Sequence, residues 1–212
     1  MVYKRFFKRF LDICISAVAL PFVFVIVLIM APVIYFTDRG PVFYNAPRIG
    51  KDGKLFKMYK FRSMYVNSPD IRLKDGSTYN SEEDPRVTPV GRFMRKTSID
   101  ELPQFLNIFL GQMSLIGPRP DTPDSLDTYP EEVRVFLTVR PGITGYSQAY
   151  FRNSVNAEIK MRNDAYYAIN CTFFMDVKIF FKTIVSVLSR QNIYTEMAEE
   201  EAAVAAEALK NR

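Results

Sequence analysis

The hydrophobic positions of the chain begin with one long uninterrupted run near the N-terminus. From Ile13 to Thr37, 25 consecutive residues include no charged side chain. As an α-helix this run would measure about 37 Å, because each residue adds 1.5 Å, and that is enough to cross a bilayer. It is also longer than the apolar part of a cleavable signal peptide. We therefore predict that the run is permanently embedded in a membrane.

Basic residues flank this run on both sides. They are Lys4, Arg5, Lys8 and Arg9 before it, and Arg39, Arg48, Lys51, Lys54, Lys57, Lys60 and Arg62 after it. Since Lys and Arg accumulate on the cytoplasmic side of membrane segments, both flanks favour that side. A re-entrant helix satisfies both flanks, and Pro21 would supply its bend because proline lacks a backbone N–H. A kinked single span is the alternative. Arg9 and Asp12, spaced i and i+3, are expected to pair at the interface.

Shorter patterns follow the apolar run. Two partly alternating stretches between Gly40 and Met64 flank Asp52 and Gly53, a turn signal that predicts a β-hairpin. The polar stretch from Val66 to Pro89 contains several turn-forming residues and predicts a long surface loop. Loops of this length are often functional.

Helical periodicity returns from Gly91 onward. Ser98 and Glu101 match a capping box, which predicts a helix that starts near Ser98. Its apolar residues recur every three or four positions; they are Leu102, Phe105, Leu106, Phe109, Leu110 and Met113. A second amphipathic helix is predicted from Phe173 to Arg190. The apolar faces of both helices could rest on a protein core or on lipid.

These patterns divide the chain into three parts. Residues 1–37 are predicted to form a basic N-terminus and a re-entrant membrane helix-break-helix. Residues 38–195 are predicted to form a compact cytoplasmic domain of the α+β class, with a β-hairpin and interfacial amphipathic helices, and this is the part that would carry a catalytic site. Residues 196–212 form an acidic, Ala-rich helical tail. The 212 residues and a hydrophobic fraction of 48% suit one domain of ordinary size.

Composition restricts the chemistry that this domain can perform. The chain contains no histidine, which excludes Ser-His-Asp triads and imidazole zinc sites. The two cysteines, Cys14 and Cys171, form no CxxC motif and no readable disulfide framework. Residues 1–195 carry 26 basic and 18 acidic side chains, a net charge of +8. This balance favours phosphate ligands, anionic lipid or nucleic acid as partners.

The candidate chemistry centres on the adjacent carboxylates Asp100 and Glu101. Arginines suited to phosphate lie on both sides of them in the sequence, and two of them sit in Pro- and Gly-containing turns. They are Arg95, Arg119 in GPRP, Arg140 in RPGITG, and Arg152. Adjacent carboxylates suit Mg²⁺, and arginines on stiff loops suit the fixed geometry of a phosphate. The alternative interpretation is structural, with Glu101 as the acid of the capping box and the arginines solvated.

Several long motifs resemble, in order, those of the bacterial sugar transferase family, the small monotopic phosphoglycosyl transferases that start lipid-linked glycan assembly. They are KRFLDI (8–13), KFRSM (60–64), SIDELPQ (98–104), NIFLGQMSLIGPRP (107–120), VRPGITG (139–145) and DAYYA (164–168). The likeness covers residues 3 to about 190. One departure is the segment QAYFRN (148–153), where the family often has QVNGRN. The sugar therefore stays open.

The resemblance implies a two-step reaction at the cytoplasmic face of the bacterial inner membrane. Asp100 would attack the β-phosphate of a UDP-sugar and release UMP, and polyprenol phosphate, such as undecaprenyl phosphate, would then accept the phosphosugar. Mg²⁺ would be held by Asp100 and Glu101. Glu101 would act either as a ligand of this metal or as a base for the lipid phosphate. The residues expected to bind substrate are Lys60, Arg62, Arg95, Gln104, Arg119, Arg140 and Arg152.

Two other functions remain to be weighed against this one. An inactive membrane scaffold would explain the apolar run and the amphipathic helices, but it would leave the pair Asp100 and Glu101 without a purpose. A nucleic-acid module is disfavoured, because no known motif is present and the basic residues flank a membrane segment. The expected partners are therefore a UDP-sugar, polyprenol phosphate and membrane lipid, but no nucleic acid. The oligomeric state is left open.

Overall fold

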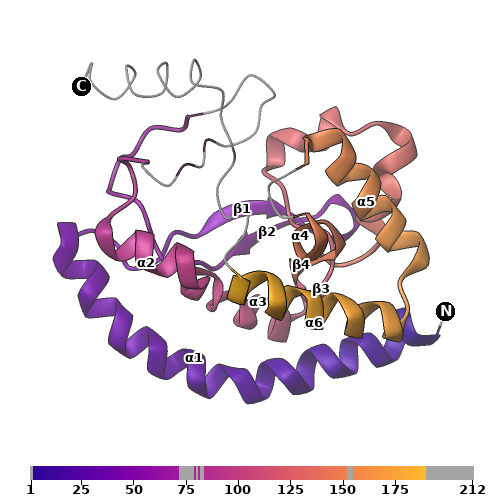
Figure 1. The fold of residues 1–212 in the computed structure, drawn as a ribbon, viewed down its shortest axis with the longest axis horizontal. Helices are drawn as coiled ribbons and strands as arrows, with labels where there is room; N and C mark the ends of the chain where they lie inside the picture. The colour runs from indigo at the N-terminus through magenta and orange to yellow at the C-terminus, as the bar shows by residue number, and fades with distance from the viewer. Residues whose placement is uncertain (1, 72–78, 80, 82–83, 152–154, 190–212) are drawn as a thin grey trace.

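A computed structural model describes residues 2–71, 79, 81, 84–151 and 155–189. A long N-terminal helix curves beneath a body of shorter helices and two small two-stranded sheets (Figure 1). The expected mixture of helices and strands with an apolar N-terminal helix is confirmed. The acidic tail and part of the 66–89 loop lie outside the described residues.

The N-terminal helix is continuous. After a π-helical turn at Tyr3–Phe7, α1 runs from Lys8–Asp38 with Pro21 and Pro32 inside it. The break expected at Pro21 is therefore absent. A proline removes one backbone hydrogen bond and adds a bend, and a long helix accommodates this as curvature. Figure 1 shows α1 as a smooth arc whose concave side holds the body.

The surface of α1 is apolar and largely uncovered. Val18 and Phe22 are each 68% exposed and Phe36 is 76% exposed. Among the described residues, the helix from Tyr3–Asp38 is the only one long and apolar enough to cross a membrane by length and composition. Such a continuous exposed apolar surface is unusual for a soluble protein and suits contact with lipid.

Polar contacts tie α1 to the body. Asp12 is buried and accepts hydrogen bonds from Ser114 Oγ at 3.1 Å and from the Leu115 N–H at 2.9 Å. The expected pairing of Arg9 with Asp12 is not what the structure shows, because the buried Asp12 carboxylate accepts its hydrogen bonds from Ser114 and the backbone of Leu115. Arg9 instead donates to the carbonyl groups of Ile108 and Phe109.

The N-terminal end of α1 is held by a buried carboxylate. Asp176 accepts from Tyr3 OH at 2.6 Å and Tyr167 OH at 2.7 Å, and its ion pair with Lys8 Nζ is 2.6 Å long. Asp176 belongs to α6 (Phe173–Ser189), so this network joins the beginning of the chain to its last described helix.

The predicted β-hairpin is present. Strands β1 (Ala46–Ile49) and β2 (Leu55–Met58) pair antiparallel, with Ile49 opposite Leu55. A 3₁₀ turn at Lys51–Gly53 joins them, and Asp52 (φ 58°) and Gly53 (φ 72°) take left-handed backbone conformations. Asp and Gly tolerate this region better than other residues, which explains the turn.

The helix predicted to start at Ser98 is instead interrupted there. Helix α2 (Pro89–Thr97) begins earlier, with Thr88 Oγ1 accepting from the Gly91 N–H, and Ser98 ends it in a left-handed conformation (φ 57°). A 3₁₀ turn at Ile99–Glu101 follows, and α3 spans only Gln104–Leu110. The capping-box prediction is wrong because Ser98 closes one helix rather than opening the next.

The second half of the chain builds the remaining core. Parallel strands β3 (Ser114–Ile116) and β4 (Gly142–Thr144) bring two loops together, and a Cβ added at Gly142 would lie 2.1 Å from the Gly117 nitrogen. The other elements are 3₁₀ segments at Pro123–Thr128 and Glu131–Thr138, and helices α4 (Tyr146–Tyr150) and α5 (Ala157–Asn170). A core cluster joins these 3₁₀ segments, α5 and β1; its buried members are Ile49, Tyr129, Val133, Phe136, Ala165 and Ala168.

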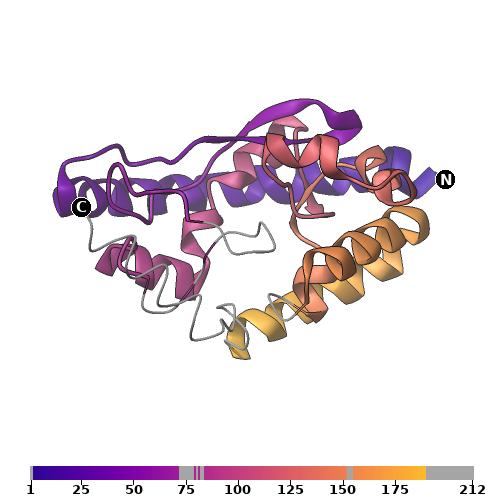
Figure 2. The same cartoon turned by 90° about the horizontal axis from the view of Figure 1, so that it is seen from above.

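The two amphipathic helices leave apolar side chains outside the core. Phe109 and Leu110 of α3 are 40% and 55% exposed, and Phe174 and Phe181 of α6 are 76% and 62% exposed. Seen from a direction turned by 90°, α2 and α6 extend from α1 toward the same side (Figure 2). Contact of these faces with a membrane stays a prediction.

Candidate active site

Asp100 and Glu101, here called the carboxylate pair, lie in the 3₁₀ turn between α2 and α3. The Phe61 N–H donates to the Asp100 carbonyl oxygen at 2.9 Å and so attaches this turn to the segment after β2. Asp100 is only 2% exposed. The interruption of the helix therefore places both carboxylates in a fixed and mostly dry position.

Two basic residues neutralise the carboxylate pair. Lys60 Nζ lies 2.8 Å from Asp100 Oδ2 and 3.4 Å from Glu101 Oε1. Arg119 binds Glu101 with its fork, with Nη2 2.6 Å from Oε1 and Nη1 3.4 Å from Oε2. The structure thus brings Lys60 and Arg119, which are far apart in the sequence, to the carboxylate pair. Their predicted role in binding substrate stays a prediction.

These charges control the ionisation of Glu101. Burial raises the pKa of Glu101, but the positive charges of Arg119 and Lys60 outweigh it and lower this pKa to about 2. The Glu101 charge in turn raises the pKa of Arg119. Glu101 is therefore a poor proton acceptor near neutral pH, since an effective general base has a pKa near the operating pH.

Gln104 lies four residues after Asp100 and is 1% exposed. Its Nε2 has no hydrogen-bond partner among the described residues. A buried amide without a partner costs free energy, and such groups in native structures call for an explanation. The predicted role of Gln104 in binding substrate fits this donor.

Asn107 supports the site and was not singled out by the sequence. It is fully buried, its Oδ1 accepts from the Tyr59 N–H at 2.8 Å, and its Nδ2 donates to the Lys57 carbonyl at 2.8 Å. These bonds dock α3 against β2 and Lys60. The signals in the sequence are an amide between the apolar residues Leu106 and Ile108 and its place at the start of the motif 107–120.

Three other predicted arginines have hydrogen-bond partners outside the carboxylate pair. The fork of Arg62 is filled by Asp38, at 2.5 and 2.6 Å, so Arg62 holds the end of α1 in this structure. Its role in binding substrate stays a prediction. Arg95 donates from Nε to Ser63 Oγ at 3.0 Å, and Arg140 donates from Nε to the Gly111 carbonyl at 2.8 Å, at the opposite end of α3 from the carboxylate pair. Arg152 lies outside the described residues.

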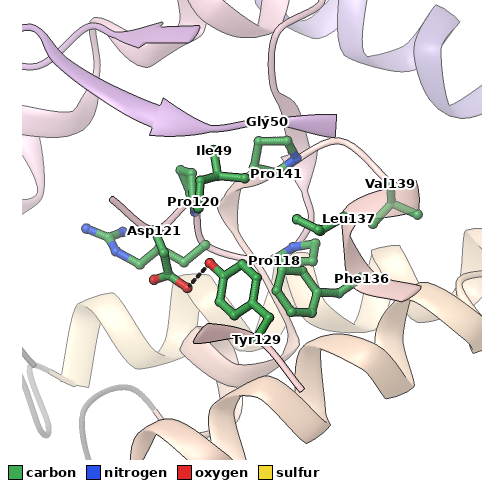
Figure 3. Close-up of a pocket in the computed structure, with 11 residues that line it drawn as sticks. Ile49, Gly50, Pro118, Pro120, Asp121, Tyr129, Phe136, Leu137, Val139 and Pro141 are labelled. Atoms are coloured by element: carbon green, nitrogen blue, oxygen red, sulfur yellow. Dashed lines mark hydrogen bonds between the residues drawn. The ribbon is translucent and has the colours of Figure 1, made fainter. Parts of the chain in front are cut away.

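A narrow pocket opens beside Arg119. Figure 3 shows Ile49 and Pro141 on one side of it, and the rings of Tyr129 and Phe136 on the other. Asp121 borders the pocket and accepts from Tyr129 OH at 3.0 Å. The residues that line the pocket are mostly apolar, with Arg119 and Asp121 among them.

A second polar cluster, formed by Asp121, Lys160 and Asp164, lies next to this pocket. Lys160 Nζ lies 2.5 Å from Asp121 Oδ1, and Asp164, one turn further along α5, is 3% exposed. Asp164 Oδ1 has no hydrogen-bond partner among the described residues. Burial raises the pKa of Asp164 to about 7, with a further contribution from the Asp121 charge and an opposing one from Lys160.

The donor set offers limited metal binding. No group of three or more His, Cys, Asp or Glu side chains suited to a metal ion occurs within the described part of the chain. The carboxylate pair supplies two hard oxygen ligands. Mg²⁺ often binds through one or two carboxylates together with substrate phosphates and water, so these residues fit Mg²⁺ bound jointly with a substrate.

Comparison with known proteins identifies the family. A sequence profile described as bacterial sugar transferase matches residues 3–190. The chain belongs to the bacterial sugar transferase family. Within this family it is 39% identical over 208 residues to the undecaprenyl-phosphate galactose phosphotransferase of Salmonella typhimurium, covering 90% of this chain and 42% of that protein.

Other members of the bacterial sugar transferase family match over different shares of their length. An N-acetylgalactosaminephosphotransferase of Aeromonas hydrophila, which is named for UDP-N-acetylgalactosamine and undecaprenyl phosphate, is 40% identical, over 87% of this chain and 44% of its own. The exopolysaccharide production protein ExoY of Sinorhizobium fredii is 37% identical over 88% of both chains. This chain thus spans less than half of the longer relatives and most of the shorter one.

Proposed function

We propose that this chain transfers a sugar phosphate from a UDP-sugar to polyprenol phosphate, with Asp100 as the nucleophile and UMP as the first product. The observation that carries the proposal is the buried carboxylate pair held between Lys60 and Arg119. A carboxylate nucleophile needs no histidine, which agrees with the composition. The names of the relatives support the same substrates and acceptor.

In the first step, an Asp100 oxygen attacks the β-phosphorus of the UDP-sugar. A new bond forms between Asp100 and that phosphorus, while the bond from the phosphorus to the oxygen that bridges the two phosphates breaks. The bridging oxygen and its electron pair leave with UMP. Lys60 orients Asp100. The phosphate competes with Glu101 for the guanidinium group of Arg119, which binds it with two N–H donors.

In the second step, a phosphate oxygen of polyprenol phosphate attacks the same phosphorus. The bond between Asp100 and phosphorus breaks, and its electron pair restores the carboxylate. The product is polyprenol diphosphosugar. The amide of Gln104 is a donor available to a phosphoryl oxygen in both steps.

Mg²⁺ would be held by Asp100 and Glu101, and when bound it would offset the negative charge of the diphosphate. The low pKa of Glu101 supports a role as metal ligand rather than as base for the lipid phosphate.

The reaction is tested by incubating the solubilised protein with UDP-sugars and measuring UMP. Asp100→Asn should abolish UMP release and prevent covalent capture of a radiolabelled phosphosugar. Asp52→Asn, in the exposed hairpin turn, is the matched control and should behave as wild type. Normal turnover by pure Asp100→Asn protein would refute the assignment. Loss of UMP release in both variants and in wild type would instead favour an inactive scaffold.

We further propose that α1 enters and leaves the cytoplasmic leaflet of the bacterial inner membrane. The basic residues on both flanks and the curvature of α1 support this arrangement (Figure 1). The test places a cysteine at Val2, which is 63% exposed, in a variant without Cys14 and Cys171. A membrane-impermeant thiol reagent applied to intact cells should leave it unlabelled, as it should a control cysteine at Asp52. Labelling at Val2 alone would mean that the helix crosses.

A further inference from the structure

Two arginines meet at the carboxyl end of α3. Arg9, from the start of α1, donates from Nη1 to the Ile108 carbonyl at 2.6 Å and from Nη2 to the Phe109 carbonyl at 2.8 Å. Arg140, from the loop before β4, donates from Nε to the Gly111 carbonyl at 2.8 Å. Both guanidinium groups therefore lie on the last turn of one helix.

The positive charge at this helix end exceeds what the helix can neutralise. The dipole of a helix places roughly half a negative charge at its carboxyl end, against two full positive charges here. Neither arginine forms an ion pair with a carboxylate within the described ranges. Asp12, the nearby acid on α1, acts on Arg9 through its charge but accepts its hydrogen bonds from Ser114 and Leu115. Arg140 has no carboxylate partner among the described residues.

The surroundings of the two arginines are apolar and exposed. Phe6 and Phe10, on either side of Arg9 in the sequence, are 64% and 63% exposed. Phe109 and Leu110, next to the carbonyl groups that the arginines bind, are 40% and 55% exposed. Arginines among exposed aromatic and aliphatic side chains are typical of the interfacial layer of a membrane, where lipid phosphates lie.

We propose that Arg9 and Arg140 form a second anion site, which binds the phosphate of a membrane lipid. The site is separate from the carboxylate pair, because α3 has seven residues and puts about 10 Å between its two ends. The terminal nitrogens of Arg140 donate no hydrogen bond to a described residue and are the donors for this phosphate. The lipid is either an anionic phospholipid or polyprenol phosphate waiting near the carboxylate pair.

The inference rests on the proposed membrane association but not on the transfer reaction, so its test does not measure turnover. The full chain is placed in phosphatidylcholine nanodiscs that contain either a minor fraction of phosphatidylglycerol or a polyprenyl phosphate. Native mass spectrometry then measures the lipids that the protein retains. The proteins compared are wild type, Arg140→Gln, Arg140→Lys and Arg162→Gln. The last is the control: Arg162 lies on α5, away from Arg9 and Arg140, and its side chain is 73% exposed.

Arg140→Gln should retain about tenfold less phosphate lipid, since a charge-assisted hydrogen bond is lost. Arg140→Lys should lose part of the retention while its unfolding temperature stays near that of wild type, and Arg162→Gln should match wild type. Loss for both lipids indicates a general phosphate site, whereas loss for polyprenyl phosphate alone indicates the acceptor. Equal retention of both lipids by all four proteins, with only a lower unfolding temperature for Arg140→Gln, would show that the arginines merely cap α3 and would overturn the proposal.

Discussion

Asp164 is expected to make the stability of this protein depend on pH. Its carboxyl group is 3% exposed, its Oδ1 lacks a hydrogen-bond partner in the described structure, and its pKa is raised to about 7 from an ordinary 3.8. Asp164→Asn removes the titration while nearly preserving the size of the side chain. The variant therefore isolates the contribution of this one proton.

The sign follows from the two pKa values. Between pH 3.8 and about 7 the folded protein keeps a proton that the unfolded chain has released. The stabilisation from this group is therefore fully present below pH 3.8 and is lost as pH rises through about 7. A difference of roughly three units corresponds to about 4 kcal/mol over the whole window, at 1.36 kcal/mol per unit.

The assay is thermal unfolding of wild type and Asp164→Asn in one detergent, at several pH values from about 4 to 8, the range in which Asp164 titrates. A change of about 4 kcal/mol corresponds to roughly 10 °C for a domain of this size. The unfolding temperature of wild type should fall relative to Asp164→Asn as pH rises. Asp52→Asn, a change at an exposed turn, should run parallel to wild type.

Parallel curves for wild type and Asp164→Asn would refute the reasoning. They would mean that the carboxyl group titrates alike in the folded and unfolded states, through water or a partner that reaches Oδ1. A widening gap toward low pH with Asp164→Asn the more stable would have the wrong sign, and would also contradict a raised pKa.

Three further predictions test the site. Arg119→Lys should lower kcat/KM for the UDP-sugar by about a hundredfold, since a lysine lacks the fork that binds Glu101 and the phosphate. Steady-state UMP release measures this effect, and unchanged kinetics would make Arg119 a surface residue. Asn107→Ala should destabilise the protein by about 1–3 kcal/mol and reduce kcat, because buried backbone groups lose their partners. Calorimetry measures the stability and UMP release measures kcat, and a normal unfolding temperature would contradict the prediction. Arg62→Ala should lower the unfolding temperature through the loss of its pair with Asp38 but leave KM for the UDP-sugar nearly unchanged; a large rise in KM would restore Arg62 to the substrate site.

The elements that depend on local pattern could be predicted from the sequence. An apolar run of 25 residues forms a long exposed helix, and a turn signal at Asp52 and Gly53 forms a hairpin. The absence of histidine restricted the chemistry to other groups, and motif order indicated the family that the comparison identified. These features follow from residues that are neighbours in the chain, where hydrophobicity, turn preference and composition act directly.

The partner of each charged residue could not be predicted in this way. Arg62 and Arg119 look alike in the sequence, but the first is filled by Asp38 at the end of α1 and the second binds Glu101. Ser98 and Glu101 matched a capping box, yet Ser98 ends α2 because Thr88 had already begun a helix nine residues long. Only tertiary structure decides the partners of these arginines, because a guanidinium binds whichever acceptor packing brings within about 3 Å. That acceptor lies 24 residues away for Arg62 and 18 residues away for Arg119.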